Sequence, residues 1–357
     1  MQVGIEENRT TERDNDLDLY RGSVMLYIVG CVHIVSSIFV DWHRDTWATL
    51  FLIEMPIIFY ISGASYALSH KKSYGKYVWS RVKRIFIPLS IYLSLYLSDR
   101  YITGSLILKD VPNEFIRYCG ATLMEQLTEL SHLWFIRPYF IIALLLPLLH
   151  YVSLRVNRYT IYALLLPVMA ALYFHPDYVL CYIVPVFAGL YYCREKPYNS
   201  YIILLVMLCA VAMCQQLGYG WNMQHNKFPS NIMFLAYTTA ALIMLHRPLQ
   251  WCCRQAARVR VVRYIVMQYA RHGYTIYLYH IHIIASMLYV YTLLSNRTTL
   301  GVFHTLIAYT FVSISTVVIM IPLAHCIDYI NKKAEGLLDA MVRWVCKVAR
   351  NSAESDR

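Results

Sequence analysis

Long apolar runs separated by shorter polar loops dominate the pattern of this chain. The runs are mostly near 20 residues, the length of a helix that crosses a bilayer core of about 30 Å. The pattern therefore predicts an all-α integral membrane protein with about ten transmembrane helices. The expected spans are residues 20–40, 48–69, 85–104, 134–152, 159–174, 178–193, 200–217, 231–246, 272–294 and 302–326.

Two segments outside these spans carry apolar residues at helical spacing. They are 113–130, in the longest loop on the predicted outer face, and 251–270, where arginines alternate with valines. Helices of this kind typically lie on the membrane surface. The arginines of 251–270 fit anionic lipid headgroups, and a phosphate-bearing cofactor is the alternative ligand.

Composition agrees with a chain embedded in the lipid bilayer. Of 357 residues, 58% are apolar and only 15% are charged, whereas a soluble domain of this length would need more polar surface. We expect one membrane domain, 20–328, between a polar N-terminal segment, 1–19, and a basic tail, 329–357. The N-terminal segment has no cleavable signal pattern.

The positive charges, which give a formal net charge of +11, gather on one predicted face. Because cytosolic loops carry the excess of lysine and arginine, we expect both termini in the cytosol and a multi-pass protein of the inner (plasma) membrane. Nucleic-acid binding is not indicated, since the chain has no aromatic-basic module or soluble platform for it. The richest loops and the tail contain Lys71, Lys72, Lys76, Arg81, Lys83, Arg84, Arg247, Arg254, Arg258, Arg260, Arg263, Lys332, Lys333, Arg343, Lys347 and Arg350.

The ten cysteines lie mostly within spans and form no CxxC pair. No carboxylate–histidine cluster suggests a metal site either. We therefore expect no disulfide framework, no metal and no permanently bound cofactor. Nothing in the pattern indicates an oligomeric state.

Ionisable residues at the first span are the strongest candidates for chemistry. His33 lies deep in the span, Arg21 lies at its predicted cytosolic entrance, and Asp18 comes just before. An ionisable group inside a bilayer costs free energy, and histidine is the side chain best suited to act as a base near neutral pH. The structural alternatives are a histidine bonded to a backbone carbonyl and an arginine that snorkels to the interface.

Six short motifs lie in order along nearly the whole chain. They are Asp18-Leu-Tyr-Arg21-Gly22 followed by His33, Met55-Pro56-Ile-Ile-Phe59-Tyr60-Ile-Ser62-Gly63, Arg81-Val-Lys-Arg84-Ile-Phe-Ile-Pro88, His132-Leu-Trp134-Phe135, Phe187-Ala-Gly189-Leu-Tyr191 and Tyr274-Thr-Ile-Tyr277-Leu-Tyr-His280. Each motif alone is weak. As an ordered set they resemble the motifs of the membrane-bound acyltransferase-3 superfamily.

The resemblance implies transfer of an acyl group, usually acetyl, from acyl-CoA to a hydroxyl, commonly on a sugar of a surface polysaccharide or glycolipid. It implies that His33 is the base and that Arg21 assists it. Arg81 and Arg84 would contact the donor phosphates, although a topology role also accounts for them. Candidates on the acceptor side or in supporting roles are Asp18, Glu54, Ser62, His132, Trp134 and His280.

Several of these candidates have more than one interpretation. Glu54 could polarise His33, bind an acceptor hydroxyl or simply lie at the interface. Trp134 could stack on an acceptor sugar or pack at the interface. Structural hydrogen bonding is the favoured role for His280, and the segment 226–229 could line the acceptor entrance.

The first motif departs from the family pattern in its spacing. The family usually has ten residues between its arginine and histidine, whereas eleven separate Arg21 and His33. At about 100° per residue, the usual spacing leaves the two roughly 20° apart around a helix, and this one leaves them about 120° apart. A single-residue π-bulge would restore a common face, and so would an Arg21 that precedes the regular helix.

A transporter or exporter of a glycan or small polar substrate is the rival interpretation, because it would use buried ionisable residues too. Many transporters show an internal repeat, and this chain has no convincing one. A membrane sensor or scaffold is a third class. The ordered motifs favour the enzyme.

Overall fold

The computed structural model describes residues 14–38, 49–69, 73–124, 130–295 and 302–355, and these contain helices but no strand. A helix coincides with each predicted span. These helices are α1 (Asn15–Tyr27) continued by η1 (Ile28–Val32) and α2 (His33–Ile38), α4 (Glu54–Leu68), α5 (Tyr74–Ile102), α7 (Ile136–Ser153), α8 (Arg158–Phe174), α9 (Tyr178–Gly189), α10 (Ser200–Gln216), α12 (Ile232–Ala256), α14 (Gly273–Ser295) and α15 (Val302–Ser355). Shorter elements are η3 (Leu108–Asp110), α6 (Val111–Met124), η4 (Ser131–Phe135), α11 (Met223–Lys227) and α13 (Arg260–Arg271).

Length and composition together test the number of membrane crossings. Five helical segments of the described chain are long and apolar enough to cross a membrane: Asn15–Ile38, Ser131–Ser153, Ile232–Ala256, Gly273–Ser295 and His304–Val348. The apolar helices α8, α9 and α10 are shorter, at 12 to 17 residues. An all-α structure with five candidate membrane spans is therefore confirmed for the described residues, whereas ten crossings and cytosolic termini stay predictions.

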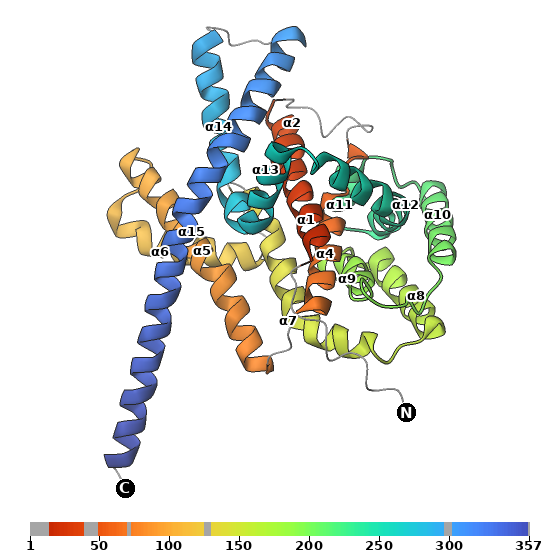
Figure 1. The fold of residues 1–357 in the computed structure, drawn as a ribbon, viewed down its shortest axis with the longest axis horizontal. Helices are drawn as coiled ribbons and strands as arrows, with labels where there is room; N and C mark the ends of the chain where they lie inside the picture. The colour runs from red at the N-terminus through yellow and green to blue at the C-terminus, as the bar shows by residue number, and fades with distance from the viewer. Residues whose placement is uncertain (1–13, 39–48, 70–72, 125–129, 296–301, 356–357) are drawn as a thin grey trace.

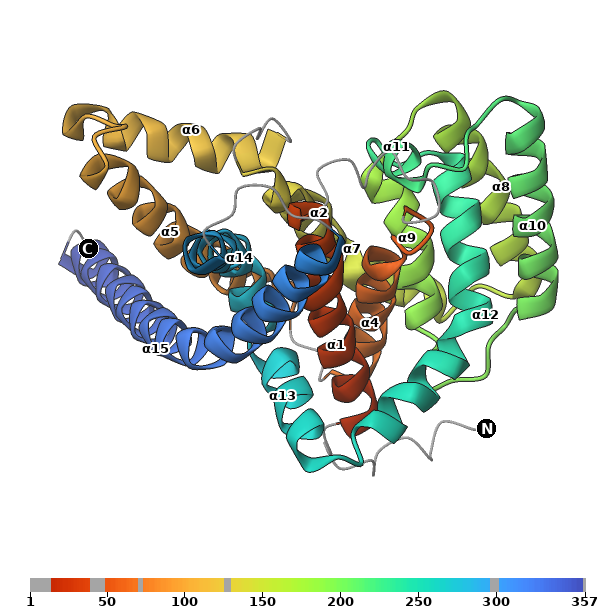
Figure 2. The same ribbon diagram turned by 90° about the horizontal axis from the view of Figure 1, so that it is seen from above.

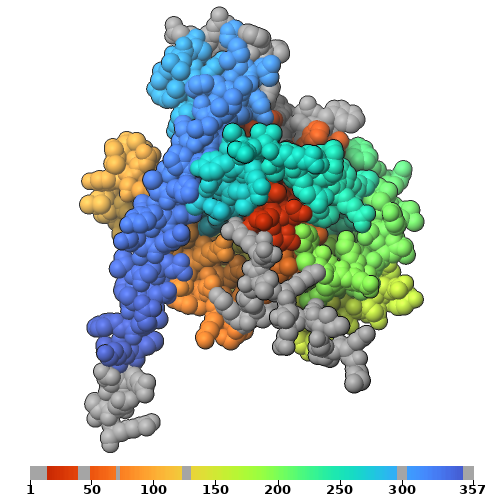
Figure 3. All heavy atoms as spheres, viewed as in Figure 1, coloured from red at the N-terminus to blue at the C-terminus, as the bar shows by residue number. Residues whose placement is uncertain are grey.

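The two central helices lie between two groups of helices. Figures 1 and 2 show α1 and α4 with α8, α9, α10 and α12 on one side and α5, α6, α14 and α15 on the other. Helix α15 is 54 residues long, and its C-terminal part extends beyond the rest of the molecular surface (Figure 3). The predicted boundary at residue 328 is therefore not a break in the helix.

The segments expected at the membrane surface are helical in part. Helix α6 covers the start of 113–130, of which 125–129 lies outside the described residues. The segment 251–270 divides between the end of α12 and helix α13. The predicted outer loops at 39–48 and 296–301, and residues 1–13 of the N-terminal segment, also lie outside the described residues.

Three glycines bring two pairs of helices into close backbone contact. A Cβ atom on Gly63 of α4 would overlap the carbonyl of Val186 on α9, and one on Gly189 of α9 would overlap the carbonyl of Tyr60 on α4. Small residues allow this approach between membrane helices. Gly22 of α1 lies against the backbone of α13 in the same way. The glycines of three family-like motifs thus fix the positions of α1, α4 and α9.

A π-helical turn interrupts the first span just before His33. It covers Ile28–Val32, and a π-turn accommodates one residue more than the α-helix around it. The hypothesis of a π-bulge is therefore confirmed. The alternative, in which Arg21 precedes the regular helix, is wrong because Arg21 lies inside α1.

Candidate functional site

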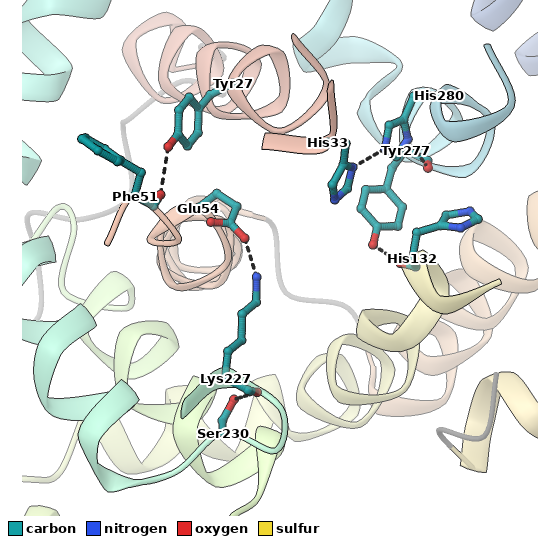
Figure 4. A network of polar contacts seen from close by, with 9 residues as sticks. All are labelled: Tyr27, His33, Phe51, Glu54, His132, Lys227, Ser230, Tyr277 and His280. Carbon is teal, nitrogen blue, oxygen red and sulfur yellow. Dashed lines mark hydrogen bonds and ion pairs between the residues drawn. The ribbon is translucent and has the colours of Figure 1, made fainter. Parts of the chain in front are cut away.

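His33 and His280 form a pair of nearly parallel rings between the first span and α14. Their ring centroids are 4.6 Å apart with an interplanar angle of 14°. Nδ1 of His33 is hydrogen-bonded to Nε2 of His280 (Figure 4). Nδ1 of His280 in turn donates to the carbonyl oxygen of Tyr277, 2.7 Å away. The π-turn and α14 thus place two imidazoles in one hydrogen-bonded chain.

This chain of contacts determines which nitrogen of His33 is free. A backbone carbonyl only accepts, so Nδ1 of His280 must carry the proton. In a neutral ring Nε2 of His280 is then an acceptor, and Nδ1 of His33 must donate to it. The remaining nitrogen, Nε2 of His33, keeps its lone pair and is able to take a proton from a substrate.

A second layer of aromatic residues surrounds the pair. The hydroxyl of Tyr277 donates to the carbonyl oxygen of His132, whose ring centroid lies 6.0 Å from that of His280. The hydroxyl of Tyr92 on α5 lies 2.6 Å from Nε2 of His282 and 3.4 Å from Nε2 of His132. The structure thus brings together His33, His132 and His280, three of the residues predicted from the sequence. No motif or pattern in the sequence singled out Tyr92 as a candidate.

Arg21 is held at the other end of the first span by two neighbours. Its Nη1 atom is 2.9 Å from Oδ1 of Asp18, one turn earlier, and its Nη2 atom donates to the hydroxyl of Ser65 on α4. Asp18 is buried. Arg21 is separated from His33 by roughly 18 Å of helix rise, so the two residues lie at opposite ends of one element. The predicted Ser62 instead bonds to Ile58 of its own helix, and its neighbour Ser65 is the one that reaches Arg21.

Glu54, the first residue of α4, forms a buried ion pair with Lys227 at the end of α11. Oε1 of Glu54 is 2.6 Å from Nζ of Lys227, and the two side chains are only 4% and 6% exposed. The observed partner of Glu54 is thus Lys227. No sequence pattern predicted this pair, because the two residues are 173 positions apart.

Trp134 lies beside the ion pair in a cluster of aromatic rings. Its ring centroid is 4.9 Å from that of Phe228 and 5.2 Å from that of Tyr178. Nζ of Lys227 lies 5.4 Å from the centroids of both Trp134 and Phe228, within range of a cation–π interaction. The indole is half-buried. The segment 226–229, predicted at the acceptor entrance, therefore lies against Trp134.

The two arginines predicted to contact the donor lie together on the first half of α5. The guanidinium of Arg81 is 5.0 Å from the ring centroid of Tyr77, and Arg84 is exposed. Lys83 between them pairs with Glu335 and Asp339 of α15, at 3.1 and 2.7 Å. Over the described ranges, no three His, Cys, Asp or Glu side chains are grouped so as to hold a metal ion.

The fold and the site define a helical protein with helices long and apolar enough to cross a membrane and a half-buried imidazole free to accept a proton. The chain belongs to the acyltransferase-3 family, whose model, an acyltransferase domain, matches residues 14–325. It is therefore a membrane acyltransferase of an O-acyltransferase family, and the resemblance seen in its six motifs is confirmed. Neither a search of the curated proteins nor a search of the solved structures found a match.

Proposed function

We propose that this protein is a multi-pass O-acyltransferase of the inner membrane that uses acyl-CoA, most simply acetyl-CoA. The acceptor is a sugar hydroxyl of a surface polysaccharide or glycolipid. The observation that carries the proposal is the chain from the Tyr277 carbonyl through His280 to His33, which leaves Nε2 of His33 free. A sugar hydroxyl is a poor nucleophile, so a base that removes its proton during attack is required.

The reaction needs one base and no resident cofactor. Nε2 of His33 takes the hydroxyl proton while the hydroxyl oxygen forms a bond to the thioester carbonyl carbon. The carbon–sulfur bond then breaks, and the CoA thiolate leaves with the proton that His33 has held. His33 returns to its neutral form, and atoms and charge balance.

Three arginines would bind the acyl-CoA donor. Arg21, oriented by Asp18 and Ser65, would hold the donor phosphate or thioester carbonyl through charge-assisted hydrogen bonds. Arg81 and Arg84 would bind CoA phosphates from the cytosol. In this topology the donor enters at the Arg21 end of the first span, and the acceptor meets His33 from the outer face, near His132 and Trp134.

The test is transfer of label from radiolabelled acetyl-CoA to candidate glycans by the purified protein in nanodiscs. His33→Ala should lower transfer by about 10²-fold or more, the contribution of a general base. The matched control is His225→Ala, because His225 is exposed on α11. Wild-type transfer by the His33 variant would contradict the role of His33. Glycan movement without consumption of acetyl-CoA would favour an exporter instead.

A further inference from the structure

The buried ion pair leaves one strong acceptor without a partner. Within the described chain, Oε2 of Glu54 is buried and accepts no hydrogen bond, while Oε1 bonds to Lys227. A buried carboxylate oxygen left without a donor costs free energy, more than a neutral group would. A ligand that brings a hydrogen-bond donor to Oε2 would recover that free energy.

The loop that carries Lys227 is held rigidly by its own side chains. The Ser230 hydroxyl donates to the Lys227 carbonyl at 3.1 Å, and the Asn226 amide donates to the Gly220 carbonyl at 2.8 Å. The Asn231 amide donates to Oδ1 of Asn226 at 2.9 Å. Because these contacts fix the loop, Lys227 holds Glu54 in one orientation, and little freedom is lost when a ligand binds.

The pair also faces the base across the site (Figure 4). Figure 4 shows Glu54 and Lys227, from α4 and α11, across from His33 and Tyr277. Trp134, beside Lys227, provides a half-buried aromatic face of the kind on which sugar rings pack. A hydrogen-bond acceptor and a cation thus lie on the side of the site that faces His33 (Figure 4), and an aromatic ring lies beside the cation.

We infer that Glu54, Lys227 and Trp134 form the acceptor subsite and that it selects uncharged sugars; this inference rests on the proposed function. The unpartnered atom, Oε2 of Glu54, is a hydrogen-bond acceptor, so it requires a ligand hydroxyl or amide N–H as donor. The charge of Lys227 is already balanced by Glu54. The carboxylate of an acidic sugar would therefore meet Glu54 without a free cation to offset the repulsion.

The test uses the full-length protein in nanodiscs with acetyl-CoA and two glycolipid-like probes, octyl glucoside and octyl glucuronide. Release of CoA thiol is measured against the concentration of each probe. The wild type should prefer the glucoside. Glu54→Gln should raise the KM for the glucoside about tenfold or more, the effect of losing a charged hydrogen bond, and leave the KM for acetyl-CoA unchanged. It should also improve use of the glucuronide, because the charge of Lys227 is then free to pair with the probe.

Two controls separate this subsite from a purely structural pair. Glu114→Gln removes a carboxylate that pairs with Arg117 on α6 and should change neither KM. The double variant Glu54→Gln with Lys227→Met leaves no buried unpaired charge, so it should unfold near the wild-type temperature while keeping the raised KM for the glucoside. An unchanged KM in both Glu54 variants, or a wild-type preference for the glucuronide, would overturn the subsite. A wild type that releases CoA with neither probe would overturn the proposed function and the subsite with it.

Discussion

The carbonyl oxygen of Gly30, in the π-turn of the first span, accepts a hydrogen bond from the hydroxyl of Ser313 on α15, 3.2 Å away. The hydroxyl of Tyr309 donates to the same oxygen at 3.2 Å. Hydrocarbon offers no water to satisfy a carbonyl that a π-turn displaces from regular helical bonding. Helix α15 therefore supplies the donors that make an extra residue tolerable next to His33.

The π-turn should be replaceable by a regular helix but not extendable. Deletion of Cys31 leaves ten residues between Arg21 and His33, which in a regular α-helix keeps the two roughly 20° apart. We expect acyl transfer within a few-fold of wild type. Insertion of one alanine after Cys31 should rotate His33 by about 100° away from His280 and abolish transfer. Equal activity of the deletion and insertion variants would show that the orientation of His33 does not depend on this turn.

His280 should act as a positioning residue that fixes the tautomer of His33. His280→Phe removes the acceptor for Nδ1 of His33, so the proton can move to Nε2 and block the base. We expect kcat to fall about 10²-fold, within the contribution of a general base, with both KM values unchanged. His280→Gln presents an amide oxygen that can accept the same hydrogen bond, so it should recover part of the rate.

Steady-state kinetics with varied acetyl-CoA and varied acceptor would separate the effect of the His280 variants on kcat from their effect on the two KM values. A merely structural role predicts that His280→Phe lowers the unfolding temperature and that His280→Gln does so equally. Loss of binding for either substrate, with kcat unchanged, would contradict the positioning role.

The helices were predictable from the sequence because length and hydropathy are local properties. Apolar runs near 20 residues marked every helix of the spans. The one-residue excess between Arg21 and His33 allowed either a π-turn or an Arg21 before the regular helix, and the structure shows the π-turn. The continuation of α15 to Ser355 was not predicted, because the basic tail is amphipathic rather than apolar. Its ion pairs with Lys83 join residues more than 250 positions apart.

The partners within the site were less predictable because they lie far apart in the sequence. Glu54 and His280 stood out as ionisable residues in apolar surroundings, but no periodicity relates them to Lys227 or His33. The sequence favoured structural hydrogen bonding for His280, and its bond to the Tyr277 carbonyl agrees with that. The second bond, to His33, depends on how α14 packs against the first span. Ser65 was missed because it lies one turn from Ser62 on the same helix, and only the packing distinguishes them.

The close contact between α4 and α9 should make Gly63 intolerant of even one methyl group. Gly63→Ala places a Cβ atom against the Val186 carbonyl, and backbone atoms of two packed helices cannot move aside cheaply. Overpacking of this kind costs about 1–3 kcal/mol, so the unfolding temperature in detergent should fall. Gly336→Ala is the matched control, since a Cβ there meets no atom within 4 Å and alanine favours the helix by up to about 1 kcal/mol. Thermal unfolding followed by size-exclusion chromatography would compare the two. A Gly63 variant as stable as the Gly336 variant would mean that α4 and α9 are not held together by this contact.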